Sequence, residues 1–127
     1  MSVGIVDSTV IIHLLRNDAL ALAWVKGFTQ RVNVTSITWL EVMYGAQGKA
    51  EQARAKAVLA NFDLEFPTQT DQLWAMTQIE LHRLSQGVGI NDCLIASVAH
   101  RLQVPMFTHN QKDFLKTLPA QMVIKPY

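Results

Sequence analysis

The sequence predicts an α/β fold built on a βαβ-type, mostly parallel sheet. Short apolar stretches rich in β-branched residues recur along the chain, and segments with apolar residues at helical spacing separate them. The first stretch, residues 3–7, is VGIV followed by an aspartate. A continuous apolar run of this kind is typical of a strand that is buried on both faces, as strands of parallel sheets are.

Length and composition favour one folded domain over residues 1–127. Half of the residues are apolar (50%), enough for a hydrophobic core, and no apolar run approaches the roughly 18 to 20 residues of a membrane helix. The first residues lack the basic segment and apolar core of a signal peptide, and the single cysteine excludes an internal disulfide. We therefore predict a cytoplasmic protein. The net charge of +1 neither supports nor excludes nucleic-acid binding.

The first half of the chain is expected to alternate helices with strands. Residues 8–16 and 20–25 have apolar residues at helical spacing, with a polar break between them. Residues 31–37 alternate valines with polar side chains, which predicts a strand that runs into a capped helix. Residues 49–59 are rich in alanine, which favours a further helix.

The second half continues the alternation. Residues 61–66 are charged and precede a proline, which predicts a short strand near a sheet edge. Residues 71–85 form a long helix with a broad apolar surface, and residues 91–102 form another, in which Ala96 and Ala99 allow close packing on a sheet. A strand, a loop or single turn, and a last short strand complete the pattern over residues 104–108, 109–114 and 122–124.

Four acidic residues occupy comparable positions, where a predicted strand passes into a helix. They are Asp7, Glu41, Asp92 and Asp113. In open α/β sheets this edge, at the carboxyl ends of the strands, is where ligands bind. We therefore expect the four carboxylates to converge in one crevice.

Each acid also has an ordinary structural explanation, which the sequence leaves open. Asp7 and Asp92 stand where helix N-caps stand, and Thr38 with Glu41 fits a capping box. A similar helix-start pattern begins at Asn110. Taken singly, each side chain could be only a cap. The recurrence of the pattern along the chain favours a shared site.

A cluster of carboxylates without matching lysines or arginines needs a cation, because like charges repel one another. Oxygen ligands of this kind suit Mg²⁺ or Mn²⁺, which keep several waters and also bind substrate phosphates. The chemistry that follows is phosphodiester hydrolysis, in which one ion activates a water and a second stabilises the leaving oxygen. One ion or two would be compatible with this set of acids.

Four sequence segments carry a family resemblance. They are IVDSTVII, ITWLEVMYG, GVGINDCLIASVA and VPMFTHNQKDF. In order, spacing and chain length they resemble the successive motifs of PIN-domain proteins, in particular VapC-type toxins of bacterial toxin–antitoxin pairs. The resemblance implies a PIN-like three-layer α/β/α fold and a Mg²⁺- or Mn²⁺-dependent endoribonuclease. It further implies an RNA substrate, a cognate VapB-like antitoxin that holds the enzyme inactive, and a homodimer.

The resemblance also implies roles for individual residues. Asp7, Glu41 and Asp92 match the three acidic metal-site positions of the family. At the fourth position this chain has Asn110 where many relatives carry an aspartate, and Asp113 follows three residues later. We favour Asp113 as an outer acid that acts through water. Asn110 is then a neutral ligand or a structural polar group.

Other polar residues lie beside these acids in the sequence. Ser8 and Thr108 resemble the polar residues that often accompany the acids of the family, and their hydroxyls could hold water or the substrate phosphate, or act only as caps. Cys93 adjoins Asp92, but no histidine partner is placed for it, so we predict a buried small residue rather than a nucleophile.

Two other interpretations of the site stay open. A phosphatase of the haloacid dehalogenase type would use Asp7 as a nucleophile, but such enzymes usually carry a second aspartate two residues on, where this chain has Thr9. A non-catalytic PIN-like module would only bind a partner, and the unusual fourth position keeps that interpretation open. For oligomerisation, the apolar helices over residues 8–25 and 49–59 are the expected interface surface.

Overall fold

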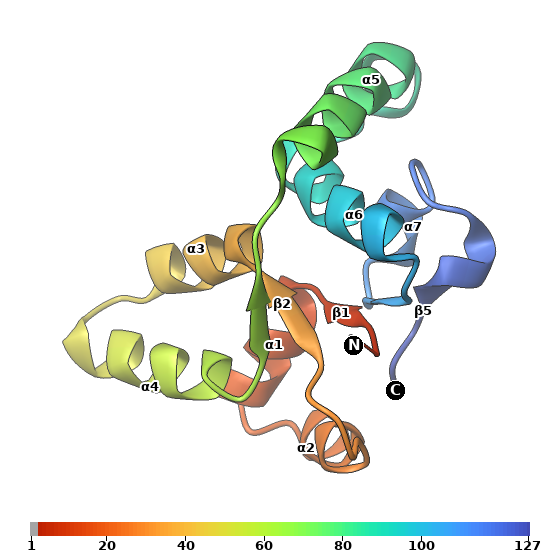
Figure 1. Ribbon diagram of the computed structural model, residues 1–127. Helices are drawn as coiled ribbons and strands as arrows, with labels where there is room; N and C mark the ends of the chain where they lie inside the picture. The colour runs from red at the N-terminus through yellow and green to blue at the C-terminus, as the bar shows by residue number, and fades with distance from the viewer. Residues whose placement is uncertain (1–2) are drawn as a thin grey trace.

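The computed structural model of the protein describes residues 3–127 and has a parallel sheet at its centre. Within that range, five strands form one sheet in the order β3-β2-β1-β4-β5, and every neighbouring pair is parallel (Figure 1). The predicted sheet is confirmed, and it is parallel throughout. The strands are β1 (Ile5–Val6), β2 (Asn33–Thr35), β3 (Asp63–Glu65), β4 (Met106–Phe107) and β5 (Val123–Ile124).

Helices connect the strands and lie close to the predicted ranges. The alanine-rich helix has the predicted bounds, and the others differ by one or two residues at their ends. A short helix, and not only a loop, follows β4, and one 3₁₀ turn, Ala120–Met122, precedes β5. The helices are α1 (Ser8–Leu15), α2 (Ala19–Lys26), α3 (Ser36–Gly45), α4 (Lys49–Leu59), α5 (Gln69–Gln86), α6 (Ile90–Leu102) and α7 (Gln111–Phe114).

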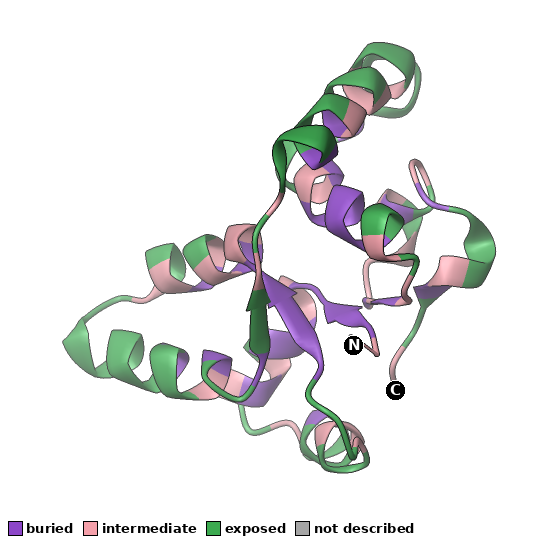
Figure 2. Cartoon of the chain, in the orientation of Figure 1, coloured by how far each residue is buried: buried purple, intermediate pink, exposed green. Residues whose placement is uncertain are grey.

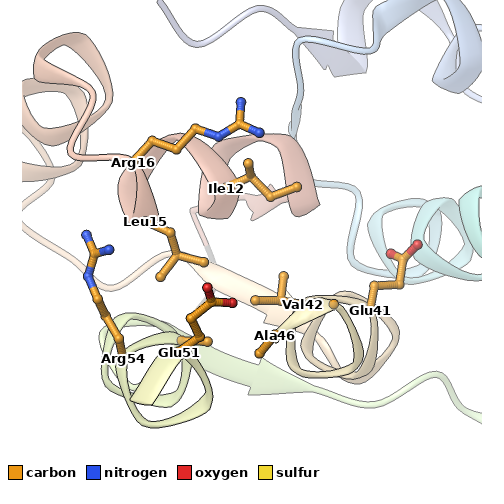
Figure 3. A pocket seen from close by; sticks show the side chains of 10 residues that line it. Ile12, Leu15, Arg16, Glu41, Val42, Ala46, Glu51 and Arg54 are labelled. Atoms are coloured by element: carbon orange, nitrogen blue, oxygen red, sulfur yellow. The ribbon is translucent and has the colours of Figure 1, made fainter. Parts of the chain in front are cut away.

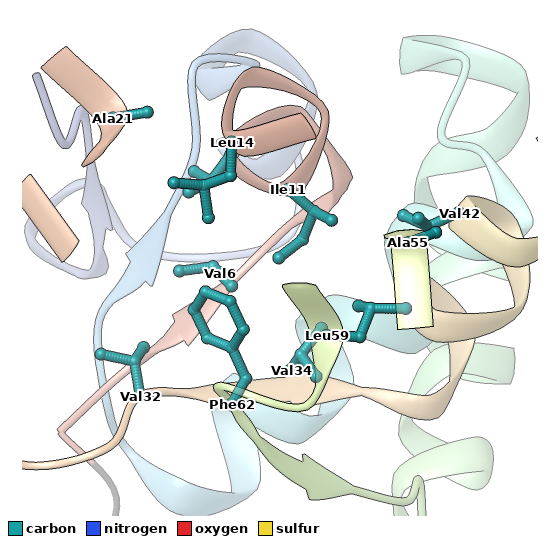
Figure 4. Close-up of a cluster of buried hydrophobic side chains, with 11 residues drawn as sticks. Val6, Ile11, Leu14, Ala21, Val32, Val34, Val42, Ala55, Leu59 and Phe62 are labelled. Carbon is teal, nitrogen blue, oxygen red and sulfur yellow. The ribbon is translucent and has the colours of Figure 1, made fainter. Parts of the chain in front are cut away.

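The centre of the sheet is buried on both faces. Successive side chains of a strand point to opposite sides of the sheet, and a hydrophobic core covers each side. Val6 belongs to a core that α1, α2 and α4 cover, together with Val34 and Leu59 (Figure 4). Ile5, its neighbour in β1, belongs to a second core formed with α6, α7 and β5. Figure 2 shows the central strands as buried ribbon between two helical layers. The three-layer α/β/α arrangement is therefore present.

The edge position predicted for the third strand is confirmed. β3 pairs only with β2 and has exposed residues, whereas all three residues of β2 are buried. At this edge Arg31 Nε donates to Asp63 Oδ1 at 2.7 Å. The charges in the strand therefore face solvent, which is how natural sheets protect an open edge from pairing with other chains.

The long helix α5 begins with a complete capping box. Thr68 Oγ1 accepts a hydrogen bond from the backbone N–H of Asp71 at 3.0 Å, and the Asp71 carboxylate accepts one from the N–H of Thr68 at 2.9 Å. Asp71 is 2% exposed and also accepts from Arg101 Nε of α6 at 3.0 Å. This network joins the start of α5 to the last turn of α6.

The apolar surface of the molecule does not lie on both of the expected helices. Within residues 3–127, α4 exposes no large hydrophobic side chain, so the expectation of an apolar interface at residues 49–59 is wrong. Ala55 and Leu59 of α4 are buried in the core, and its exposed apolar residues are alanines. On α5, by contrast, Leu73, Met76 and Leu84 are 56%, 60% and 99% exposed. None of the helices within residues 3–127 combines the length and apolar content needed to cross a membrane.

Candidate functional site

Asp7 lies where β1 passes into α1, at the carboxyl edge of the sheet. It is the N-cap of α1, with Oδ1 accepting from the Thr9 N–H at 3.1 Å and from Thr9 Oγ1 at 2.6 Å. Its other oxygen, Oδ2, accepts from Thr108 Oγ1 at 2.6 Å. The side chain is 3% exposed, and burial raises its pKa while these hydrogen bonds oppose the rise. Asp7 is thus a cap and a candidate site residue at once.

Glu41 lies on α3, which follows the adjacent strand β2. The helix begins one turn earlier than the predicted capping box requires: Thr35 is its N-cap and accepts from the Thr38 N–H at 3.2 Å. The predicted box of Thr38 and Glu41 is therefore wrong, and the glutamate is not engaged in capping. Its Oε2 accepts from Asn91 Nδ2 at 3.3 Å, while its Oε1 is buried and has no hydrogen-bond partner among residues 3–127.

Asp92 lies in the first turn of α6. Gly89 is the N-cap of that helix, so the expectation that Asp92 stands at the cap is wrong. Glu41 and Asp92 line the same cavity of about 460 Å³, with Asn91 between them in the lining. Burial, and then the charges of Asp113, Glu41 and Asp7, raise the pKa of Asp92 to about 6. An acid in the first turn of a helix is favoured by the helix dipole, so burial, together with the neighbouring carboxylates, outweighs that benefit here.

Asp113 is bound by its own segment. Asn110 is the N-cap of α7, as the helix-start pattern predicts, but the bond runs in the other direction: Asn110 Nδ2 donates to Asp113 Oδ2 at 2.7 Å. Lys116 Nζ forms an ion pair with Asp113 Oδ1 at 3.0 Å. The hydrogen bonds from Lys116 and Asn110 hold the pKa of Asp113 below its usual range. This acid is ionised, and the expectation of a cluster without a matching lysine is wrong.

Sequence reasoning missed three contacts in this region. Thr9 binds Asp7, whereas no bond from the Ser8 hydroxyl is present in the described part of the chain. Lys116 pairs with Asp113 at a spacing of three residues, which is a helix pairing that the sequence does contain. Asn91 reaches Glu41 across fifty residues of chain, and no local pattern signals that.

The four acids interact electrostatically at one edge of the sheet. The charge of Asp7 raises the pKa of Glu41, and the charges of the other three acids raise the pKa of Asp92. Among residues 3–127, no group of three His, Cys, Asp or Glu side chains is placed to ligate one ion together. The donor set is nevertheless all oxygen, and Glu41 Oε1 lacks a partner. Such a site fits a hard cation that keeps several of its waters and takes one or two carboxylates.

The neighbouring cysteine and histidine do not form a nucleophilic pair. Cys93 is 1% exposed, and burial raises its thiol pKa to about 11, which confirms the prediction of a buried small residue. His109 packs instead against Tyr127, with ring centroids 4.4 Å apart, and against His13 at 5.0 Å. Burial lowers the pKa of His109, so its imidazole is neutral near pH 7.

Solved structures share this fold. One of DNA-bound VapBC from Salmonella typhimurium has a TM-score of 0.81 at 22% identity, with 98% of each chain covered. A toxin–antitoxin complex from Klebsiella pneumoniae has a TM-score of 0.79 at 22% identity, also with 98% of each chain covered. VapBC-1 from nontypeable Haemophilus influenzae has a TM-score of 0.73 at 24% identity, covering 89% of this chain and 90% of that chain.

The sequence comparisons give two further results. No curated protein matches the chain. The family model for the PIN domain matches residues 4–117, a span that contains all four acids. The chain therefore belongs to the PIN-domain family.

Proposed function

We propose that this protein is a Mg²⁺- or Mn²⁺-dependent endoribonuclease and the VapC-type toxin of a toxin–antitoxin pair. The observation that carries the proposal is the group of carboxylates at the carboxyl edge of the sheet: their charges raise the pKa values of Glu41 and Asp92, and Glu41 Oε1 is buried without a hydrogen-bond partner among residues 3–127. Holding like charges together costs stability unless a bound cation offsets the repulsion. Family membership and the resemblance to VapC-type motifs support the same conclusion.

In this proposal Asp7, Glu41 and Asp92 hold the cation, and Asp113 acts from outside through water. A bound divalent ion supplies a water of lowered pKa and neutralises charge that develops on the phosphate. The two threonine hydroxyls hold Asp7 in one orientation. Asp113 stays ionised beside Lys116. Its carboxylate can therefore accept a hydrogen bond from a water molecule without first losing a proton itself. No covalent enzyme intermediate is required.

The proposal includes partners. Several solved structures of the same fold are complexes of a toxin with an antitoxin, which supports a VapB-like antitoxin for this chain. A basic antitoxin side chain placed among the acids would offset their repulsion as a cation does. We also propose a homodimer. The cytoplasmic location and the single domain over residues 1–127 stay predictions.

The phosphatase alternative finds no support in the geometry around Asp7. Both carboxylate oxygens accept hydrogen bonds, and Thr9 occupies the position where such a phosphatase carries its second aspartate. The binding-module alternative is an outcome of the experiment below.

The experiment is cleavage of total cellular RNA by the purified protein, free of antitoxin, with Mg²⁺ or Mn²⁺. We expect discrete fragments that vanish with EDTA and with either Asp7→Asn or Asp92→Asn. Asp63→Asn is the matched control, because Asp63 is exposed on the sheet edge and should leave cleavage unchanged. Full metal-dependent activity in Asp7→Asn would overturn the assignment. A folded protein without cleavage or specific Mn²⁺ affinity would favour the binding module.

A further inference from the structure

A second cavity leads away from the candidate site. It has a volume of about 480 Å³ and lies between α1, α3 and α4, and we call it the α1–α4 pocket (Figure 3). Ile12, Leu15 and Val42 give it an apolar wall, and Arg16 from α1 and Arg54 from α4 also line it, with guanidinium groups that point apart in Figure 3. A pocket of this size is within the range of roughly 300 to 1,000 Å³ that is typical of sites for small ligands.

The α1–α4 pocket and the cavity that contains Asp92 share one lining residue, Glu41. Glu41 stands at the end opposite the two arginines in Figure 3. The same glutamate also lines the cavity that contains Asp92. A chain-like ligand that extends from the α1–α4 pocket past Glu41 would therefore enter the cavity that contains Asp92.

The two arginines of this pocket are available to a ligand. Both are exposed, and within residues 3–127 neither guanidinium makes a hydrogen bond or an ion pair. Two other arginines, Arg31 and Arg101, are by contrast held by aspartates. Glu51, the second acid that lines this pocket besides Glu41, accepts from the backbone N–H of Gln47 at 2.7 Å and is thus tied to the start of α4.

A single RNA strand has the charge pattern that matches this layout. At the acids a phosphate needs a cation between it and the carboxylates, whereas the phosphates on either side need positive groups of their own. Arginine is the side chain best suited to phosphate, because its fork of N–H groups can bind two oxygens. The apolar wall suits the face of an unpaired base, which a duplex would keep stacked inside.

We propose that the α1–α4 pocket binds the single-stranded RNA that flanks the scissile phosphate, with Arg16 and Arg54 contacting its backbone. This inference rests on the proposed ribonuclease function and deepens it by giving the path of the substrate. The arginines act in substrate binding and take no part in the chemical step. Their removal should therefore raise KM and leave kcat nearly unchanged.

The test is the salt dependence of binding to a short, labelled, mixed-sequence single-stranded RNA, measured by fluorescence anisotropy in EDTA. Each phosphate contact to a single strand contributes about 0.7 to the slope of log affinity against log salt, so Arg16→Gln with Arg54→Gln should lower that slope by about 1.4. The matched control is Lys49→Gln with Lys56→Gln, because both lysines are exposed on α4 outside the pocket. Thermal unfolding verifies that each variant folds.

The outcomes separate this inference from the proposed function. A lowered salt slope in the arginine double variant but not in the lysine control would support the pocket as the RNA path. Arg54→Lys keeps the charge at that position and should restore the part of the slope that Arg54 contributes. An unchanged slope would overturn it, as would an equal loss in the lysine control. The same arginine pair weakening only the binding of a protein partner would also overturn it. Ribonuclease activity is read separately, from Mn²⁺-dependent cleavage by the wild-type protein.

Discussion

At the scale of single residues, Asp7 shows how the chain holds a charged group in its interior. Thr9 is two positions away in the sequence, while Thr108 comes from the far end of the chain, beyond β4. Thr108 Oγ1 also accepts from the backbone N–H of Asn110 at 2.8 Å. One buried hydroxyl therefore connects the first strand to the loop that carries Asn110.

Thr108→Val should destabilise the protein by about 1 to 3 kcal/mol. Valine matches threonine in shape, but it leaves Asp7 Oδ2 and the Asn110 N–H without this partner in a buried place. The measurement is the free energy of unfolding in urea. Thr117→Val is the control, since no hydrogen bond from its side chain is present in the described structure and its backbone N–H binds Phe114. Equal stability of the two variants would contradict the role of Thr108.

Asp92 gives the metal-free protein a predictable pH dependence. Its pKa rises from an ordinary 3.8 to about 6 in the folded state, so between these values the folded chain keeps a proton that the unfolded chain loses. The free energy of unfolding must then fall as the pH rises through this window. Asp92→Asn cannot ionise and should be more stable than the wild type at pH 7, with the difference vanishing near pH 4.

Thermal unfolding in EDTA at several pH values measures this difference. Mn²⁺ should raise the Tm of the wild type at pH 7 by offsetting the repulsion, and it should raise the Tm of Asp92→Asn less. A difference between the two proteins that does not change with pH would contradict the assigned cause.

At the scale of elements, the junction of α5 and α6 depends on one ion pair. Asp71 is buried, and Arg101 is the cation bound to it, with Glu65 3.6 Å from the same guanidinium. Arg101→Leu leaves a buried carboxylate with only its capping bond, which should cost about 2 kcal/mol or more. Arg83→Leu, at an exposed site near the end of α5, is the control. Urea unfolding of both variants checks this expectation, and similar losses would refute it.

Helix ends were predicted closely, whereas each strand lies inside its predicted range but is shorter than that range. The helix pattern is local, because its apolar spacing and its caps lie within one segment. A strand ends where its neighbours stop pairing: β1 is limited to the two residues that pair with both β2 and β4, although the apolar run around it is longer. Its length is thus set by distant parts of the chain.

At the scale of the whole molecule, α5 carries one exposed apolar surface available for a second copy, and α1 and α2 carry another. Leu73, Met76 and Leu84 fall on one face of α5 by their spacing, and all three are exposed. We expect Leu73→Glu with Met76→Glu to convert a homodimer to a monomer in light scattering. Leu20→Glu is the control on α2, within the other surface predicted from the sequence. Dissociation by Leu20→Glu instead would move the interface to that helix.

Some features of the candidate site follow from local sequence, and others depend on tertiary structure. The types of the acidic residues, and their places after strands, could be predicted, because a parallel sheet gathers the carboxyl ends of its strands at one edge. The N-caps of α3 and α6 are Thr35 and Gly89, each within about one turn of the predicted N-cap. Several residues that can cap a helix lie close together at both places. The identity of the site residues stays a prediction for mutagenesis.

The sequence by itself determined the α/β class, the order of helices and strands, and the set of acids, because these depend on periodicity and residue type. Tertiary structure alone decided that Asn91 binds Glu41 and that α5 rather than α4 exposes large apolar side chains. Each of these depends on which segments the sheet order brings side by side. No spacing within a single segment carries that information.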